Sequence, residues 1–139
     1  IATIKRRSIL RASKGTKQRV LLQVGDDPLV VVGKNSFLHD ALKIVGADNV
    51  YHDLEERYPR PSLEDVLYRD PDIVVVLSMS EIKKVTKNMA LKWVNYKNLT
   101  AVKNKRVHIL KSDSLLRPSM RLLEGLSLLE KTIFSLGVK

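Results

Sequence analysis

The sequence contains no cysteine, and this absence excludes several kinds of site at once. Without thiols the chain can form no disulfide framework, no thiolate metal centre and no cysteine nucleophile. Long hydrophobic runs are absent too, because no stretch approaches the roughly 18 apolar residues of a membrane-spanning helix. The chain begins at Ile1 without a signal-peptide pattern, so we expect it to be processed or trimmed.

Acidic residues are missing from positions 1–19, which hold seven basic side chains. The remainder has 18 basic and 15 acidic residues, so most of the formal charge of +10 comes from the leading segment. Such a charge suggests a nucleic-acid partner. However, aromatic residues make up only 5% of the chain and do not interleave with a basic helix stripe. Nucleic-acid binding, if any, would therefore reside in the leading segment.

Strands and helices alternate along the chain, as hydrophobic periodicity predicts. A length of 139 residues with 44% hydrophobic content suits one globular domain. The pattern predicts strands at 19–24, 49–51, 72–77 and 105–110, a short extended stretch at 29–32, and helices beginning near 35, 62 and 80, with a final helix whose apolar stripe runs from Leu122 to Leu136. This order predicts an α/β class with three Rossmann-like layers: a mainly parallel sheet with helices on both faces.

The stretch Tyr58–Leu67 is the most informative part of the sequence. Its two prolines hold the residues before them in extended conformations. Ser62 and Asp65 fit a capping box that opens a helix. Entrances of this kind, between a strand and a helix, are where open α/β sheets place their ligands.

A phosphate loop is suggested only superficially by Val32–Ser36. The first required glycine is replaced by Pro28, and Asn35 stands where a hydroxyl would bind magnesium. The three histidines, His39, His52 and His108, lack the spacing of metal ligands. No serine lies in a glycine-flanked elbow. We find no catalytic constellation and expect neither an enzyme nor a cofactor.

Six blocks of residues occur together in the order and spacing of one family. They are Gly33–Leu38, Gly46–Val50, Tyr58–Leu67, Asp70–Val75, Ala101–Val107 and Arg117–Leu126. On these blocks, the chain from about residue 19 onward resembles the C-terminal lobe of a periplasmic substrate-binding protein of the ferric-siderophore and cobalamin ABC transporter class.

The resemblance implies two α/β lobes joined by one long helix, with the ligand held between them. Residues 1–18 would then be a remnant of the interlobe helix, and residues 19–139 the C-terminal substrate-binding lobe. We expect a native chain about twice as long, with an export signal, in the periplasm or lipid-anchored outside the cell. The implied partners are a ferric siderophore, haem or cobalamin, the ABC transporter permease and the missing N-terminal lobe, but no nucleic acid.

The resemblance also implies ligand-binding residues. Tyr58 corresponds to an aromatic residue that lines the cleft, and Arg117 to a cleft arginine before the last helix. Arg60 and Lys34 complete the expected ligand-binding set. Tyr58 could otherwise be a loop tyrosine packed on a proline, and Arg117 could pair with Asp113. The cobalamin binders carry further aromatic residues after the first strand, where this chain has valines.

Glu64 is the residue that the resemblance implies for permease docking. In the family, a glutamate at this helix start on each lobe enters an arginine pocket of the permease. The alternative is that Glu64 only complements the helix dipole in the first turn. For the whole chain, the alternative functions are a nucleic-acid-binding or nucleotide-binding α/β domain.

Overall fold

The computed structural model describes residues 3, 6, 9, 10, 18–25, 28–78, 90–111, 126, 127 and 129–135. Five strands form one sheet: β1 (Arg19–Gly25), β2 (Val30–Val31), β3 (Asp48–Asn49), β4 (Ile73–Ser78) and β5 (Val107–Lys111). Helices with described bounds include α2 (Phe37–Val45), α3 (Leu63–Arg69), α5 (Thr100–Lys103) and the π-helix η1 (Lys131–Ser135), and further helical residues lie at 90–93.

The sheet is mixed and mainly parallel, as the alternation of elements predicts. Strand β1 lies next to β4, which in turn pairs with β5, and both pairings are parallel. The other edge of β1 is shared between two short strands. Its first half pairs in parallel with β3, and its second half pairs antiparallel with β2. Among the strands that the structure describes, only β2 is antiparallel.

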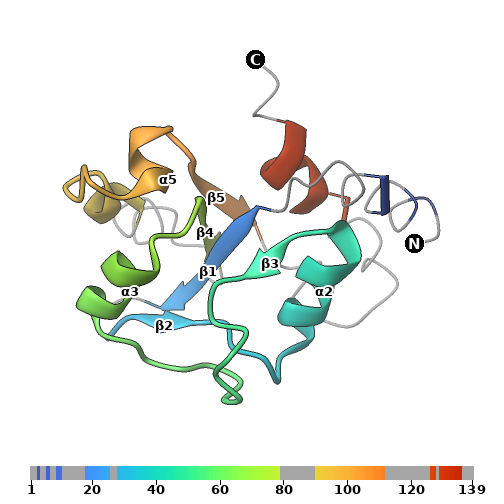
Figure 1. Cartoon of the computed structure of the whole chain (residues 1–139), viewed down its shortest axis with the longest axis horizontal. Coiled ribbons are helices and arrows are strands. Elements are labelled where there is room, and N and C mark those ends of the chain that lie inside the picture. The colour runs from blue at the N-terminus through green and yellow to red at the C-terminus, as the bar shows by residue number, and fades with distance from the viewer. Residues whose placement is uncertain are drawn as a thin grey trace.

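Helices cover both faces of the sheet, because the strands are apolar on both faces. In β4, Ile73, Val75 and Leu77 pack in one core with α2 and with the C-terminal residues Leu126, Leu129 and Ile133. Val74 and Val76 face the opposite core, which includes residues of α3, α5 and 90–99. Figure 1 shows α3 and α5 on one side of the sheet and α2 on the other. The predicted α/β fold class is confirmed.

The ends of α2 and the start of α3 follow from local sequence signals. Ser36 caps α2 by accepting a hydrogen bond from Leu38 N, and Gly46 ends it in the left-handed conformation. Ser62 caps α3 by accepting from Asp65 N. These caps satisfy backbone groups that a helix terminus leaves unpaired. The sequence predicts Asn35 or Ser36 as the N-cap of the first of these helices, Gly46 at its C-terminal end and Ser62 at the start of the second. The structure selects Ser36 and confirms Gly46 and Ser62.

The short strand β3 departs from its prediction because a side chain interrupts it. The predicted strand 49–51 is replaced by β3 at residues 48–49, since Asn49 Oδ1 accepts a hydrogen bond from Tyr51 N at 2.9 Å. This bond forms an Asx-type turn that takes the chain out of the sheet. The strands predicted at 72–77 and 105–110 begin one and two residues later, at Ile73 and Val107.

Several predicted features lie wholly or partly outside the described residues. These are Arg117 and its loop, most of the helix from residue 80, and parts of the first and last helices. In the sequence, Ile82, Val85, Met89 and Trp93 recur at spacings of three and four, which predicts a buried helix face, and Trp93 is buried in the structure. Leu126, Leu129 and Ile133 of the final stripe are fully buried as well.

Candidate ligand-binding site

The parallel strands β1, β4 and β5 end at the same edge of the sheet, at Gly25, Ser78 and Lys111. After β1 the chain passes to β3 on one side and then crosses to β4 on the other. In open α/β sheets, such a reversal leaves a crevice outside the carboxyl ends of the strands, and ligands bind there. The end of β1 is therefore the place where this fold would hold a ligand.

The loop at residues 54–61, here called the approach segment, reaches this edge because Pro59 attaches it to β2. Val31 N in β2 donates a hydrogen bond to Pro59 O at 3.0 Å. Pro59 is buried, whereas Tyr58 keeps 39% of its surface exposed and Arg60 is also exposed. Figure 1 shows this loop passing beside β2 before it enters α3. An accessible aromatic ring and a guanidinium thus flank an anchored proline.

Gly33, just after β2, allows the approach segment to pack closely against the chain at this point, because the two segments are in contact there. Gly33 N donates to Arg57 O at 3.0 Å. A Cβ atom at Gly33 would lie 2.0 Å from Glu56 O, closer than any van der Waals contact. The glycine that superficially suggested a phosphate loop is thus required for packing against the loop before Tyr58.

Glu64 lies in the first turn of α3 with its side chain exposed. The same turn holds Asp65, whose amide completes the Ser62 cap at 3.1 Å. The capping-box prediction is only half right, because the Asp65 carboxylate accepts from Arg69 Nε at 2.9 Å. The Glu64 carboxylate is therefore presented to the surface at the positive end of a helix dipole.

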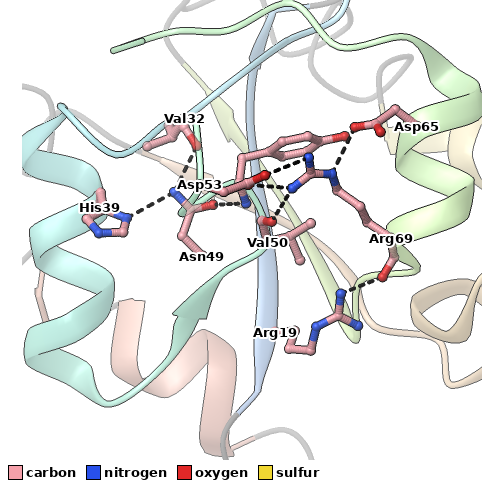
Figure 2. A network of polar contacts seen from close by, with 9 residues as sticks. Arg19, Val32, His39, Asn49, Val50, Asp53, Asp65 and Arg69 are labelled. Atoms are coloured by element: carbon pink, nitrogen blue, oxygen red, sulfur yellow. Dashed lines mark hydrogen bonds and ion pairs between the residues drawn. The ribbon is translucent and has the colours of Figure 1, made fainter. Parts of the chain in front are cut away.

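Arg69 joins α3 to the loop that precedes the approach segment, as Figure 2 shows. Its terminal nitrogens Nη1 and Nη2 contact the two Asp53 carboxylate oxygens at 2.6 Å and 3.1 Å. Nη1 also donates to Val50 O at 3.0 Å, and the guanidinium lies 4.3 Å from the centre of the Tyr51 ring. Because these contacts fix residue 53 to the end of α3, they restrict the loop that carries Tyr58.

Charge pairing and burial around Arg69 change the ionisation of its neighbours. The hydrogen bond from Arg69 holds the pKa of Asp53 below its ordinary value. Burial, followed by the neighbouring Asp65 carboxylate, raises the pKa of Tyr51. The Tyr51 hydroxyl is buried and has no hydrogen-bond partner in the described part of the chain. This phenol is therefore neutral at physiological pH and belongs to the core.

At the opposite edge of the sheet, Asp70 connects α3 to α5. Its carboxylate accepts from Thr100 N at 2.8 Å and from Thr100 Oγ1 at 2.6 Å. These bonds hold the pKa of Asp70 below its ordinary value. Arg19 Nη1 donates to the Asp70 carbonyl oxygen at 3.0 Å. The backbone of Asp70 is in the left-handed conformation, with φ of 49°. The aspartate at the start of the fourth block thus has a structural role.

Gln23, in β1, and Trp93 form a buried polar contact near the carboxyl edge of the sheet. Trp93 Nε1 donates to Gln23 Oε1 at 2.7 Å, and Gln23 Nε2 donates to Gly25 O at 3.0 Å. Both side chains are almost fully buried. The pair fixes residues 90–93 against the end of β1, and sequence reasoning identified Trp93 but not Gln23.

Surface cavities among the described residues include the following two. One, of about 360 Å³, is lined by residues 95–99 and Leu67. The other, of about 390 Å³, lies beside α2 and receives Lys34. Lys34 N donates to Leu54 O at 2.8 Å, so its backbone is close to the approach segment. Its side chain lines a cavity to which neither Tyr58 nor Arg60 contributes.

Among the described residues, no group of three or more His, Asp or Glu side chains could hold a metal ion. A search of the same residues found no helix with the length and hydrophobicity needed to span a bilayer. The functional residues that sequence reasoning missed are Arg69, Gln23 and Asn49. Only Arg69 had a local signal, namely a carboxylate four residues earlier on a predicted helix.

A mainly parallel sheet with an exposed aromatic ring and a cation at its carboxyl edge is typical of a ligand-binding α/β lobe. Residues 7–114 match the family model described as periplasmic binding protein. The chain belongs to this family, whose members are binding proteins rather than enzymes and act in the periplasm or outside the cell.

Two proteins that cover most of this chain are about twice as long. The Vitamin B12-binding protein of Vibrio parahaemolyticus is 29% identical over 119 residues, which are 84% of this chain and 42% of that protein. An ABC transporter substrate-binding protein from Listeria monocytogenes has a TM-score of 0.81 at 24% identity, and the match covers 96% of this chain and 54% of that one.

Two further solved structures share the fold. Staphylococcus aureus IsdE complexed with haem gives a TM-score of 0.76 at 23% identity, covering 96% of this chain and 54% of that chain. The structure described as an ABC-type Fe³⁺-hydroxamate transport system from Saccharomonospora viridis gives a TM-score of 0.72 at 24% identity. The match covers 96% of this chain and 47% of that chain. The chain thus spans about half the length of the solved proteins that it matches.

Proposed function

We propose that this chain is the C-terminal lobe of the substrate-binding component of an ABC importer. In this proposal, two lobes capture a ferric siderophore, haem or a cobalamin between them and deliver it to the membrane permease. The observation that carries the proposal is the family match over residues 7–114, together with coverage of only about half of each relative. A single lobe supplies one wall of such a cleft.

The ligand would contact the carboxyl edge of the sheet through Tyr58 and Arg60. Tyr58 offers an apolar ring face with a hydroxyl, which suits the flat, oxygen-edged ligands of this class. The Arg60 guanidinium can donate paired hydrogen bonds to carboxylate or amide oxygens. Arg117, outside the described residues, remains a proposed third contact. Lys34 stays a prediction of the sequence as a ligand contact, and it lines a cavity to which neither Tyr58 nor Arg60 contributes.

The N-terminal residues support a second lobe. Thr3, Arg6, Ile9 and Leu10 are helical. Ile9 and Leu10 are 69% and 58% exposed. Apolar residues on a helix at the end of a lobe fit an interlobe helix whose other contacts belong to the rest of a longer protein. We propose that this protein is exported and is either free in the periplasm or lipid-anchored.

Glu64 is the proposed permease contact. Its exposed carboxylate at the start of α3 is accessible to an arginine pocket, and Arg69 holds the helix in place. In the intact transporter, Glu64→Ala should leave ligand affinity unchanged and reduce uptake or stimulation of ATP hydrolysis. Weakened ligand binding with normal permease coupling would refute this role.

The ligand contact is tested by calorimetry on the two-lobed protein with whichever of these ligands binds most tightly. Tyr58→Ala should raise Kd by about tenfold, equivalent to about 1.4 kcal/mol. Tyr68→Ala is the matched control, because Tyr68 is 88% exposed on α3. Equal Kd values for the wild type and Tyr58→Ala would exclude Tyr58 from the cleft.

A further inference from the structure

The cavity beside α2 has a lining rich in groups that bind anions. It lies at the edge of the sheet formed by β3, next to the start of β1, whereas the proposed ligand cleft is at the strand ends. Its volume is about 390 Å³, and its lining consists of Lys34, His39, Lys43, Ala47, Asp48, Asn49 and His52. The lining therefore contains two lysines and two histidines but only one carboxylate, that of Asp48.

The hydrogen bonds of Asn49 determine which nitrogen of His39 carries the proton. Asn49 Oδ1 accepts from Tyr51 N at 2.9 Å, and Nδ2 donates to Val32 O at 2.8 Å, so the orientation of the amide is fixed. The same Nδ2 lies 3.2 Å from His39 Nδ1, as Figure 2 shows. Because an amide nitrogen can only donate, Nδ1 must accept, and the proton of the neutral ring resides on Nε2.

His39 therefore supplies a fixed donor rather than a titrating charge. The residue is only 4% exposed, and its ring lines the cavity. Burial, followed by the charge of Lys43, holds its pKa below the ordinary value, so the ring is neutral at physiological pH. Since Nδ1 faces Asn49, the Nε2–H edge is the one that remains for the cavity.

The two lysines supply the positive charge. Lys34 and Lys43 have exposed side chains, and they approach the cavity from before α2 and from its last turn. Flexible ammonium groups can close over an anion held by a buried donor, because each presents three N–H bonds. His52 adds a further exposed imidazole, and the Asp48 carboxylate opposes the positive charge of the lysines.

We propose that this cavity binds a small oxyanion, with His39 Nε2–H as the buried donor and Lys34 and Lys43 as the charged ligands. The proposal does not rest on the proposed function, because the cavity lining includes neither Tyr58 nor Arg60. Phosphate, sulfate and carboxylate groups share the required chemistry of several acceptor oxygens around one negative centre.

The test is a titration of the 139-residue chain with inorganic phosphate at constant ionic strength, followed by NMR of the imidazole nitrogens. We expect saturable shifts of the His39 signals, with Nε2 changing more than Nδ1. Parallel titrations with sulfate and acetate should distinguish a site for tetrahedral oxyanions from one for carboxylates. Shifts that increase linearly without saturation, for all three anions, would overturn the proposal.

Variants give an independent measurement. The double variant Lys34→Ala with Lys43→Ala should raise the phosphate Kd at least tenfold and leave the fold intact, because both side chains are exposed. The matched control replaces Lys97 and Lys103, which are exposed and do not line this cavity, with alanine. An equal loss of affinity in both double variants would show non-specific charge attraction and contradict the site.

Discussion

Arg69 and Asp53 are 16 residues apart in the sequence, yet both terminal nitrogens of the arginine contact the aspartate carboxylate, at 2.6 Å and 3.1 Å. This pair connects α3 to the loop that leads to Tyr58, as Figure 2 shows for the arginine and its partners. The geometry of the proposed ligand-binding segment therefore depends on a contact outside that segment.

We expect Arg69→Ala to destabilise the chain by about 2 kcal/mol. Its ion pairs are partly exposed and contribute little each, but the variant also leaves the Val50 carbonyl unpaired and removes the cation–π contact. Urea unfolding measures the change, with Arg57→Ala as the control, because Arg57 is exposed in the same loop. Equal midpoints for the two variants would contradict the role of Arg69.

The Asp53 pair also makes a prediction for the pH dependence of stability. The pKa of Asp53 is lowered in the folded chain, so in acid the unfolded chain binds more protons there and stability increases with pH. This contribution is complete above the ordinary aspartate pKa of about 3.9 and is lost as the pH falls through the lower folded value. Asp53→Asn should flatten the acid limb of the stability profile, and an unchanged slope would refute the assignment.

Gly33→Ala should destabilise the chain by about 3 kcal/mol or displace the loop at residues 54–59. The added Cβ would lie 2.0 Å from a backbone oxygen that cannot move independently of the loop. Gly25→Ala is the matched control, because its Cβ would lie 3.1 Å from the Val30 side chain. Thermal unfolding measures both variants, and a smaller loss for Gly33→Ala than for Gly25→Ala would contradict the packing argument.

The Gln23 and Trp93 pair is suited to a double-mutant cycle. Trp93→Phe leaves the Gln23 oxygen buried without its donor and should cost about 1–3 kcal/mol. Gln23→Met removes the acceptor and should cost a similar amount. The double variant should cost less than the sum of the two, because neither partner is then left unpaired. Simple additivity of the measured free energies would show that the hydrogen bond contributes no coupling.

The sequence predicts those parts of the fold whose signals are local. Ser36, Gly46 and Ser62 end helices through bonds within a few residues, and the apolar run at 73–77 forms a strand buried on both faces. The alternation of strands and helices predicted the mainly parallel sheet, and the resemblance identified the family because its blocks are short contiguous motifs.

Contacts between distant residues could not be predicted in this way. Gln23 and Trp93 are 70 residues apart, and nothing in either segment indicates the other. The Asx-type turn at Asn49 ended a predicted strand early, because a side-chain bond replaced the sheet pairing that β-propensity favours. The cavity beside α2 likewise depends on residues from a helix, a strand and two loops, which only the fold brings together.

The central claim is that this chain forms half of a binding site for a large metal complex. The most direct measurement is a calorimetric titration of the two-lobed protein with a cobalamin, a ferric catecholate siderophore, a ferric hydroxamate siderophore and haem, repeated with the 139-residue chain alone. We predict saturable one-to-one binding of one ligand at micromolar or lower Kd by the two-lobed protein, and much weaker binding by the single lobe. Absence of binding by the two-lobed protein to all four ligands would contradict the account.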